Sequence, residues 1–290
     1  LCASPSLLIA DEPTTGLDVT VQAQVLDDLR RAATEMGTGV LVITHDLGIV
    51  ANYCDRVYLM HAGEVVEEAA VDRFFAAPRN PASLSLLAAQ LGHPEDALRL
   101  RGFPIHPSAL PTGCWLHPRC PFADEASGCV GEHPELIEVA PGQRSRCHRD
   151  AVVAPAAEAH LRGLAADSAP LRRKQLPALA HTDANRVLEV RDVYRRFSIK
   201  DREGALGRRT KHVLQACADI SFDAYRGETI GIIGESGSGK TTLARVVCGL
   251  IPASEGEITV EGLAVGDLTK TSGASFAPTC RSSSRSRSSR

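Results

Sequence analysis

The sequence has no apolar run that approaches the roughly 20 residues needed to cross a bilayer. Its N-terminus lacks the basic region and long apolar stretch of a secretory signal, so we expect a cytoplasmic location. The sequence has no excess of positive charge, with 32 Lys and Arg against 35 Asp and Glu. Nucleic acid is therefore not an expected partner. An initiating methionine is also absent, and an apolar pattern begins soon after Leu1. We therefore interpret the chain as a fragment.

The composition that is present is that of a globular protein, with 43% hydrophobic and 23% charged residues, and 290 residues allow about two domains. Short apolar runs at 7–10 and 40–44 predict strands buried on both faces of a parallel sheet, joined by a helix over 19–36. Residues 55–69 alternate as in a hairpin. These patterns predict an α/β fold with a mainly parallel sheet.

The segment "GESGSGKT" fits the phosphate-loop pattern G-x-x-x-x-G-K-[ST] at every fixed position. Glycines let the backbone bring its N–H groups to phosphate oxygens at the start of a helix. Lys240 is then expected to contact the β- and γ-phosphates, and Thr241 to bind Mg²⁺. A glycine-rich turn that binds nothing is the alternative. The expected nucleotide-binding residues are Gly234, Glu235, Ser236, Gly237, Ser238, Gly239, Lys240, Thr241 and Thr242.

The segment "LLIADEP" is an apolar strand that ends in Asp11 and Glu12. Two carboxylates at the carboxyl edge of a sheet lie where ligands bind in open α/β folds. Asp11 would hold Mg²⁺, and Glu12 would orient or deprotonate an attacking water. Such a pair is also common in helix caps, so on its own it indicates little.

The segments "LLIADEPTTGLD" and "VLVITHDLGIV" closely resemble the second half of the nucleotide-binding domain of ABC transporters, specifically dipeptide and oligopeptide importers. The resemblance implies that Asp11 and Glu12 are the Walker B pair and that Asp18 ends the D-loop. It also implies that His45 is the switch histidine that contacts the γ-phosphate. A lone histidine after a strand would otherwise be structural.

Four of the nine cysteines cluster with the spacing C-x5-C-x8-C-x17-C, which differs from common zinc sites. Spacing alone allows only a metal of unspecified kind. The surrounding segment resembles the C-terminal extension of the same peptide importers, which can carry a 4Fe–4S cluster. By that resemblance its ligands are Cys114, Cys120, Cys129 and Cys147. Zinc with His117, His133 or His148, or four free thiols, are the alternatives.

Residues from about 187 onward resemble the first half of another such ATPase domain. Phe197 matches the aromatic position that stacks on adenine, with Tyr194 as the second candidate and a core position as the alternative. The expected organisation is therefore a back half-domain, an extension, a linker, a front half-domain and a disordered Ser/Arg tail. Their expected bounds are 1–77, 78–150, 151–186, 187–270 and 271–290.

The phosphate loop normally precedes the acidic strand in the sequence, whereas in this chain the loop comes after that strand. We interpret the chain as the back half of one ATPase joined to the front half of a second, from a tandem fusion. Neither an "LSGGQ"-like signature nor a Q-loop glutamine is present. The two halves could still fold as one permuted core, in which Lys240 approaches Asp11.

The resemblance implies an ATP-binding subunit of a peptide importer, of dipeptide, oligopeptide or nickel type. It would be an ATPase that uses ATP and Mg²⁺, impaired here by its missing motifs. Its partners would be membrane-spanning permease subunits, a second ABC ATPase domain and, indirectly, an external substrate-binding protein, at the cytoplasmic face of the cell membrane. A non-catalytic nucleotide-binding or iron–sulfur fragment is the alternative. An ABC-type ATPase of DNA repair or translation is disfavoured by the extension.

Overall fold

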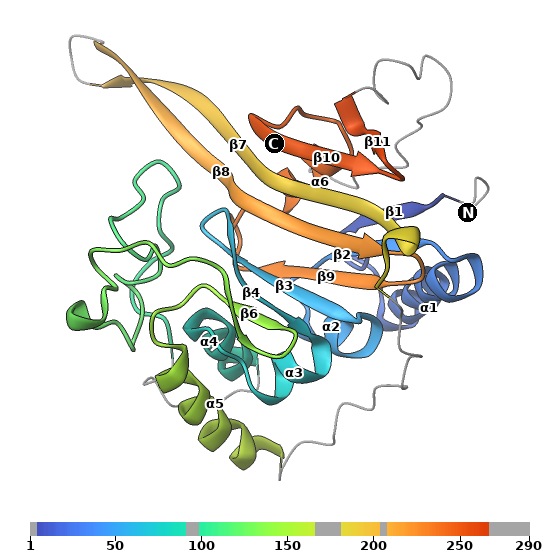
Figure 1. The fold of residues 1–290 in the computed structure, drawn as a ribbon, viewed down its shortest axis with the longest axis horizontal. Helices are drawn as coiled ribbons and strands as arrows, with labels where there is room; N and C mark the ends of the chain where they lie inside the picture. Colours follow the sequence, from blue (N-terminus) through green and yellow to red (C-terminus); the bar gives the residue numbers. More distant parts are fainter. Residues whose placement is uncertain (1–4, 91–98, 166–180, 204–207, 267–290) are drawn as a thin grey trace, which may run out of the picture.

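Two β-sheets with a helix between them organise the computed structural model, which describes residues 5–90, 99–165, 181–203 and 208–266 (Figure 1). The first half of the chain forms β1 Leu7–Asp11, α1 Val19–Met36, β2 Gly39–Ile43, α2 Leu47–Tyr53, β3 Arg56–His61, β4 Glu64–Ala70, α3 Val71–Ala76, α4 Pro81–Gln90, β5 Ile137–Ala140, β6 Gln143–Ser145 and α5 Asp150–Ala165. The second half forms β7 Arg186–Glu203, β8 Arg208–Tyr225, β9 Thr229–Gly234, α6 Lys240–Val247, β10 Glu255–Val260 and β11 Leu263–Ala264. Short 3₁₀ turns lie at Glu125–Ser127 and Asp183–Asn185.

The larger sheet contains strands from both halves of the chain, in the order β1-β2-β9-β3-β4-β6-β5. Strand β9, which leads into the phosphate loop, lies parallel between β2 and β3. Val40 is opposite Thr229 on one side, and Arg56 is opposite Ile230 on the other. The expectation that both halves contribute to one sheet is therefore confirmed, with a parallel core β1-β2-β9-β3 and antiparallel strands β4, β6 and β5 at one edge. The acidic strand and the phosphate loop meet in space although they are far apart in sequence.

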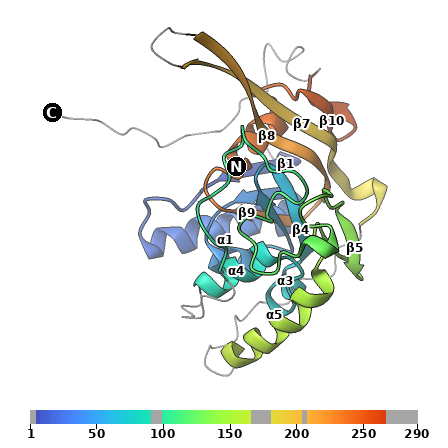
Figure 2. The same cartoon turned by 90° about the vertical axis from the view of Figure 1, so that its left-hand side faces the viewer.

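Burial of the central strands follows from their apolar sequences. Every residue of β2 and β9 is buried. On one face of the sheet, α6 packs beneath the four-stranded antiparallel sheet β11-β10-β7-β8. On the other face, residues of α1, α2, α3 and α4 form a second core. Figure 2 shows these helices on the side opposite β7 and β10. The strands that carry the site are thus held in the middle of a layered core.

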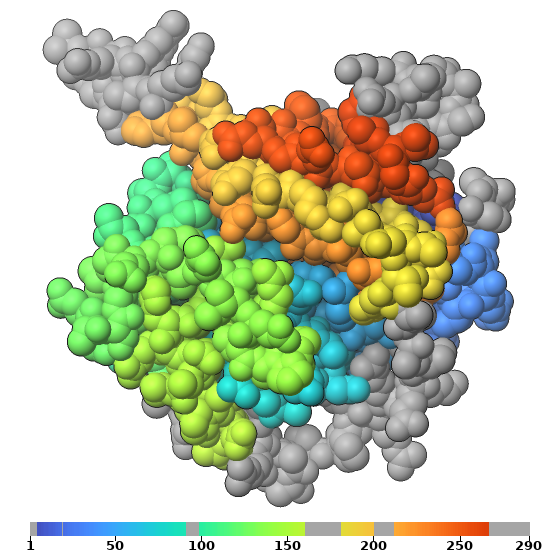
Figure 3. Space-filling view, viewed as in Figure 1, coloured from blue at the N-terminus to red at the C-terminus, as the bar shows by residue number. Residues whose placement is uncertain are grey.

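The extension continues the large sheet, which the sequence patterns did not predict. Strands β5 and β6 add antiparallel to β4 at its free edge. Beside this edge the Glu67 carboxylate is fully buried and accepts hydrogen bonds from Arg79 N, Asn80 N, Ser83 Oγ and Gln143 Nε2. Figure 3 shows the extension as a lobe against the sheets. It is therefore an integral part of the fold.

The first part of the segment expected as a linker, 151–186, is helical. Residues from Asp150 to Ala165 form α5, and Val153 and Ala157 on this helix are buried against Leu84. Alanine has the highest helix propensity, so an alanine-rich segment without a clear apolar period can still form a helix on a packed surface. Residues 166–180 of this segment, like the Ser/Arg tail at 271–290, lie outside the described residues.

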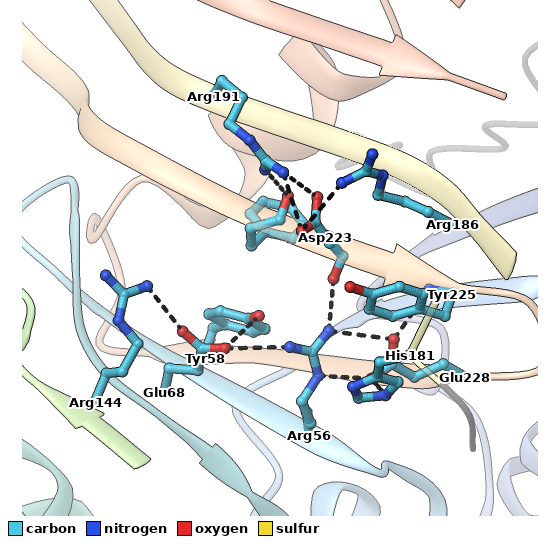
Figure 4. Close-up of polar contacts among 11 residues, drawn as sticks. Arg56, Tyr58, Glu68, Arg144, His181, Arg186, Arg191, Asp223, Tyr225 and Glu228 are labelled. Atoms are coloured by element: carbon cyan, nitrogen blue, oxygen red, sulfur yellow. Dashed lines mark hydrogen bonds and ion pairs between the residues drawn. The ribbon is translucent and has the colours of Figure 1, made fainter. Parts of the chain in front are cut away.

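An ion-pair network joins the two halves at the start of β3 (Figure 4). Arg56 donates through Nε to Glu228 Oε1 at 2.6 Å and through Nη2 to the carbonyl oxygen of Asp223 at 2.6 Å. It also contacts Glu68, which accepts the Tyr58 hydroxyl at 2.9 Å. Glu228 is 0% exposed. This network fixes the turn before β9 against β3.

None of the helices in the described ranges combines the length and apolar character needed to span a bilayer.

Candidate nucleotide site

The phosphate loop takes a conformation that requires its glycines. Gly234, Gly237 and Gly239 have φ values of 146°, 81° and 102°, in the region that side chains disfavour. A Cβ on Gly234 would lie 2.1 Å from the carbonyl oxygen of Met60. A Cβ on Gly239 would lie 2.2 Å from the carbonyl oxygen of Ala216. The loop therefore packs its backbone directly against β3 and β8, and α6 begins at Lys240.

Lys240 folds back over this loop. Its Nζ donates to the carbonyl oxygens of Gly234 at 2.8 Å and Glu235 at 2.9 Å, and to Ser238 Oγ at 3.4 Å. Burial lowers the pKa of Lys240, and the nearby carboxylates of Glu12, Asp11 and Glu235 oppose that shift. The ammonium group is thus held by neutral acceptors that an anionic phosphate oxygen can replace.

Asp11 and Thr241 meet across 230 positions of sequence. The Thr241 hydroxyl donates to Asp11 Oδ1 at 3.4 Å, at the point where β1 ends and α6 begins. Both groups are hard oxygen donors of the kind that Mg²⁺ prefers, and Mg²⁺ usually takes only one or two protein carboxylates alongside phosphate and water. Among the described residues, no group of three or more His, Cys, Asp or Glu side chains is placed to hold a metal. The pair fits a Mg²⁺ ion that arrives with its nucleotide.

Glu12 and His45 lie together beside this pair. His45 Nδ1 is 2.9 Å from a Glu12 carboxylate oxygen, and the Thr15 hydroxyl donates to the same carboxylate at 3.2 Å. Glu12 follows β1 and His45 follows β2, which pair in parallel. Glu12 has a φ of 50°, uncommon for a residue with a side chain. The structure therefore brings together the two residues expected to be catalytic.

Three other expected site residues have structural partners. Asp18 caps α1, accepting from the backbone N–H groups of Thr20 and Val21 at 3.0 Å each. The Arg195 guanidinium lies 4.4 Å from the centre of the Phe197 ring, and the Arg196 guanidinium lies 5.0 Å from that of Tyr194. Adenine stacking on either aromatic ring would have to use the opposite face or displace an arginine.

The four clustered cysteines line one cavity of about 10 Å³, together with His117 and His148. Burial raises the pKa of Cys114 and Cys147 to about 12 and that of Cys120 to about 11, so these thiols are neutral. The donor set suits a metal cluster, but a cavity of this size holds about one water molecule. Among the described residues these thiols are not placed to hold a metal, so a 4Fe–4S cluster would require the segment to open.

Two residues at the phosphate loop belong to no motif and were not predicted from the sequence. Arg119, in the extension, forms a two-pronged ion pair with Glu235 at 2.6 and 3.0 Å. His61, at the end of β3, is buried with Nε2 unpartnered, and burial lowers its pKa to about 4. Neither belongs to a local motif, because each reaches the loop only through the folding of distant segments.

The comparisons agree with this geometry. Residues 217–286 match the family model described as ABC transporter. The chain is 40% identical over 268 residues to the oligopeptide transport ATP-binding protein OppD of Mycobacterium tuberculosis, a match that covers 91% of this chain and 42% of that relative. It is 35% identical over 271 residues to the glutathione import ATP-binding protein GsiA of Shigella dysenteriae, covering 93% of this chain and 34% of that relative. The chain thus spans less than half of either relative. Its mostly parallel core and its phosphate loop show that it has the α/β P-loop NTPase fold of ABC-type ATPase domains.

Proposed function

We propose that this chain is an ATP-binding part of an ABC importer for peptides and that it couples ATP binding and hydrolysis to transport. The contact between Thr241 and Asp11 carries the nucleotide part of the proposal, because it joins the phosphate loop and the acidic strand in one place. Relatives named for oligopeptide transport and glutathione import support the peptide part.

The residues divide the work of phosphoryl transfer, which depends on positioning and charge stabilisation. Lys240 and the loop N–H groups bind the β- and γ-phosphates. Asp11 and Thr241 hold Mg²⁺, which when bound neutralises charge on the phosphates. Glu12 orients the attacking water and takes its proton, and His45, at 2.9 Å from Glu12, contacts the γ-phosphate.

We infer that the chain corresponds to the back half of one ATPase and the front half of a second in a tandem protein. The reversed motif order supports this, as does a match that covers 91% of this chain but 42% of the oligopeptide transport relative. In this proposal its partners are permease subunits, a second ATPase domain and, indirectly, an external substrate-binding protein. It acts at the cytoplasmic face of the membrane.

Hydrolysis by the chain alone is expected to be slow. The sequence has no "LSGGQ"-like motif and no Q-loop glutamine, so a second domain would have to complete the site around the γ-phosphate. The alternative, a fragment that binds nucleotide without hydrolysis or transport, rests on the same absence. Phosphate release measured with and without a domain that carries the signature motif separates the two proposals.

The composite site is tested by the Mg²⁺ dependence of nucleotide binding. Asp11→Asn keeps the shape of the side chain and removes its charge. The factor by which Mg²⁺ increases the affinity for a fluorescent ATP analogue should therefore be about tenfold smaller in Asp11→Asn than in the unmodified chain. Binding without Mg²⁺ should not weaken. Asp28→Asn is the matched control, because its carboxylate is exposed on α1 and pairs with Arg31. An unchanged Mg²⁺ response in Asp11→Asn would mean that the two halves do not share one site.

The cysteine cluster is a second candidate site, for a 4Fe–4S cluster. Four thiols that line one cavity favour it, whereas the size of that cavity requires the segment to open on loading. We expect anaerobic reconstitution with iron and sulfide to give about four irons per chain. The same treatment of Cys129→Ser should give fewer. Cys54→Ser, which lies outside the cluster, is the control. If Cys129→Ser took up as much iron as Cys54→Ser, the proposal would be contradicted.

A further inference from the structure

The Arg119–Glu235 ion pair connects the extension directly to the phosphate loop. Both guanidinium nitrogens of the Arg119 fork contact the carboxylate, at 2.6 and 3.0 Å, which is the geometry of the strongest charge-assisted pairs. Arg119 is 6% exposed, although it lies 116 positions before its partner. Arg119 therefore reaches out from the interior to a Glu235 side chain that is 37% exposed at the phosphate loop.

Several contacts position Arg119 for this role. Its backbone N–H donates to the carbonyl oxygen of Leu116, whose side chain is buried in the core beneath the sheet. Its own carbonyl oxygen accepts from Arg101 N at 2.7 Å, and its Nε donates to the carbonyl oxygen of Arg101 at 3.2 Å. The arginine is thus fixed before any ligand binds, which lowers the entropy cost of using it.

Glu235 presents an electrostatic problem for a phosphate site. Its carboxylate belongs to the loop that must receive a polyanion. Burial would raise the pKa of Glu235, but the hydrogen bonds and charge of Arg119, together with His61 and Lys240, outweigh burial and lower it, so the carboxylate is ionised. His61 beside it is neutral at neutral pH, because burial lowers its pKa to about 4. Lys240 is expected to turn to the phosphates, so Arg119 is the cation that stays with Glu235.

We propose that Arg119 is a positioning residue for nucleotide binding, which neutralises Glu235 so that the phosphate loop can accept the β- and γ-phosphates. This inference rests on the proposed nucleotide-binding function and adds to it a role for the extension. Loss of the arginine charge leaves a carboxylate next to the bound phosphates. The repulsion at protein-surface dielectric weakens binding by about tenfold.

The test compares Mg-ATP affinity in Arg119→Gln, Glu235→Gln and the double variant. We expect Arg119→Gln to weaken binding about tenfold. Glu235→Gln keeps the loop N–H group and removes the charge that opposes the phosphates, so it should tighten binding, and the double variant should return to within about threefold of the unmodified chain. A purely structural bridge gives a different pattern, since breaking it from either side would weaken binding equally. Equal weakening in the two single variants would therefore overturn the proposal.

Two further readouts separate charge from folding. The loss of affinity in Arg119→Gln should be larger for ATP than for ADP. It should also become smaller as the salt concentration rises, because salt screens the repulsion between Glu235 and the phosphates. Arg119→Lys keeps the charge without the fork and should bind Mg-ATP within about threefold of the unmodified chain, even if Arg119→Gln fails to fold. A loss in Arg119→Lys as large as in Arg119→Gln would overturn the charge role. If the unmodified chain binds no Mg-ATP, both this inference and the proposed function are wrong.

Discussion

Replacing Lys240 with Ala is expected to weaken ATP binding about a hundredfold. The ammonium is held over the loop by two carbonyl oxygens and one hydroxyl, at 2.8 to 3.4 Å. These are neutral acceptors, whereas the phosphates of ATP are anions. Charge-assisted hydrogen bonds contribute about 1.5–3 kcal/mol each, so losing one or two of them gives an effect of this order. Titration of both chains with a fluorescent ATP analogue in the presence of Mg²⁺ measures this change in affinity.

The thermal stability of the same variant separates binding from folding. A ligand stabilises the folded state by about 2.7 kcal/mol at a hundred times its Kd, so ATP should raise the melting temperature of the unmodified chain. In Lys240→Ala that rise should disappear, while the melting temperature without ATP changes little. Arg245→Ala is the matched control, because it removes an exposed cation from the same helix. A full ATP response in Lys240→Ala would contradict the site.

The sequence predicted the parts of the site that have a local signature. Helix α1 has the expected bounds at 19–36, with Gly37 in the left-handed conformation at its end. The phosphate loop and the acidic strand are likewise short patterns set by backbone geometry. Their meeting in one sheet was a hypothesis drawn from the complementary motifs of the two halves, and in the structure β9 lies between β2 and β3.

The elements that were not predicted depend on tertiary contacts. The segments "IEVA" and "QRS" are too short for an alternating pattern, and they become β5 and β6 beside the available edge of β4. Arg119 has no motif, and only the folded extension places it at Glu235. Asp18 shows the converse: the residue lies where the D-loop was expected, yet its observed contacts are those of a helix cap. Local patterns thus fix an element's type more firmly than a side chain's partner.

The second large effect concerns Arg56, the residue that joins the two halves. Burial alone would lower the pKa of Arg56, but Tyr58, Glu228 and Glu68 outweigh burial and raise it, so the guanidinium is charged. Arg56→Met would leave the Glu228 carboxylate, 0% exposed, without its main partner. Breaking one side of a buried ion pair costs about 3–5 kcal/mol of unfolding free energy. Urea unfolding followed by circular dichroism measures the loss.

Two companion variants show whether this loss comes from the join between the halves. In Arg56→Met/Glu228→Gln no uncompensated charge remains, so the double variant should recover part of the stability lost in Arg56→Met. Arg31→Ala breaks an exposed pair with Asp28 and should change the unfolding free energy by less than about 0.5 kcal/mol. Because β9 lies between β2 and β3, unfolding of Arg56→Met should also release ATP at the same urea concentration. Loss of ATP binding well before the loss of helical signal would instead mean that the halves separate while each stays folded.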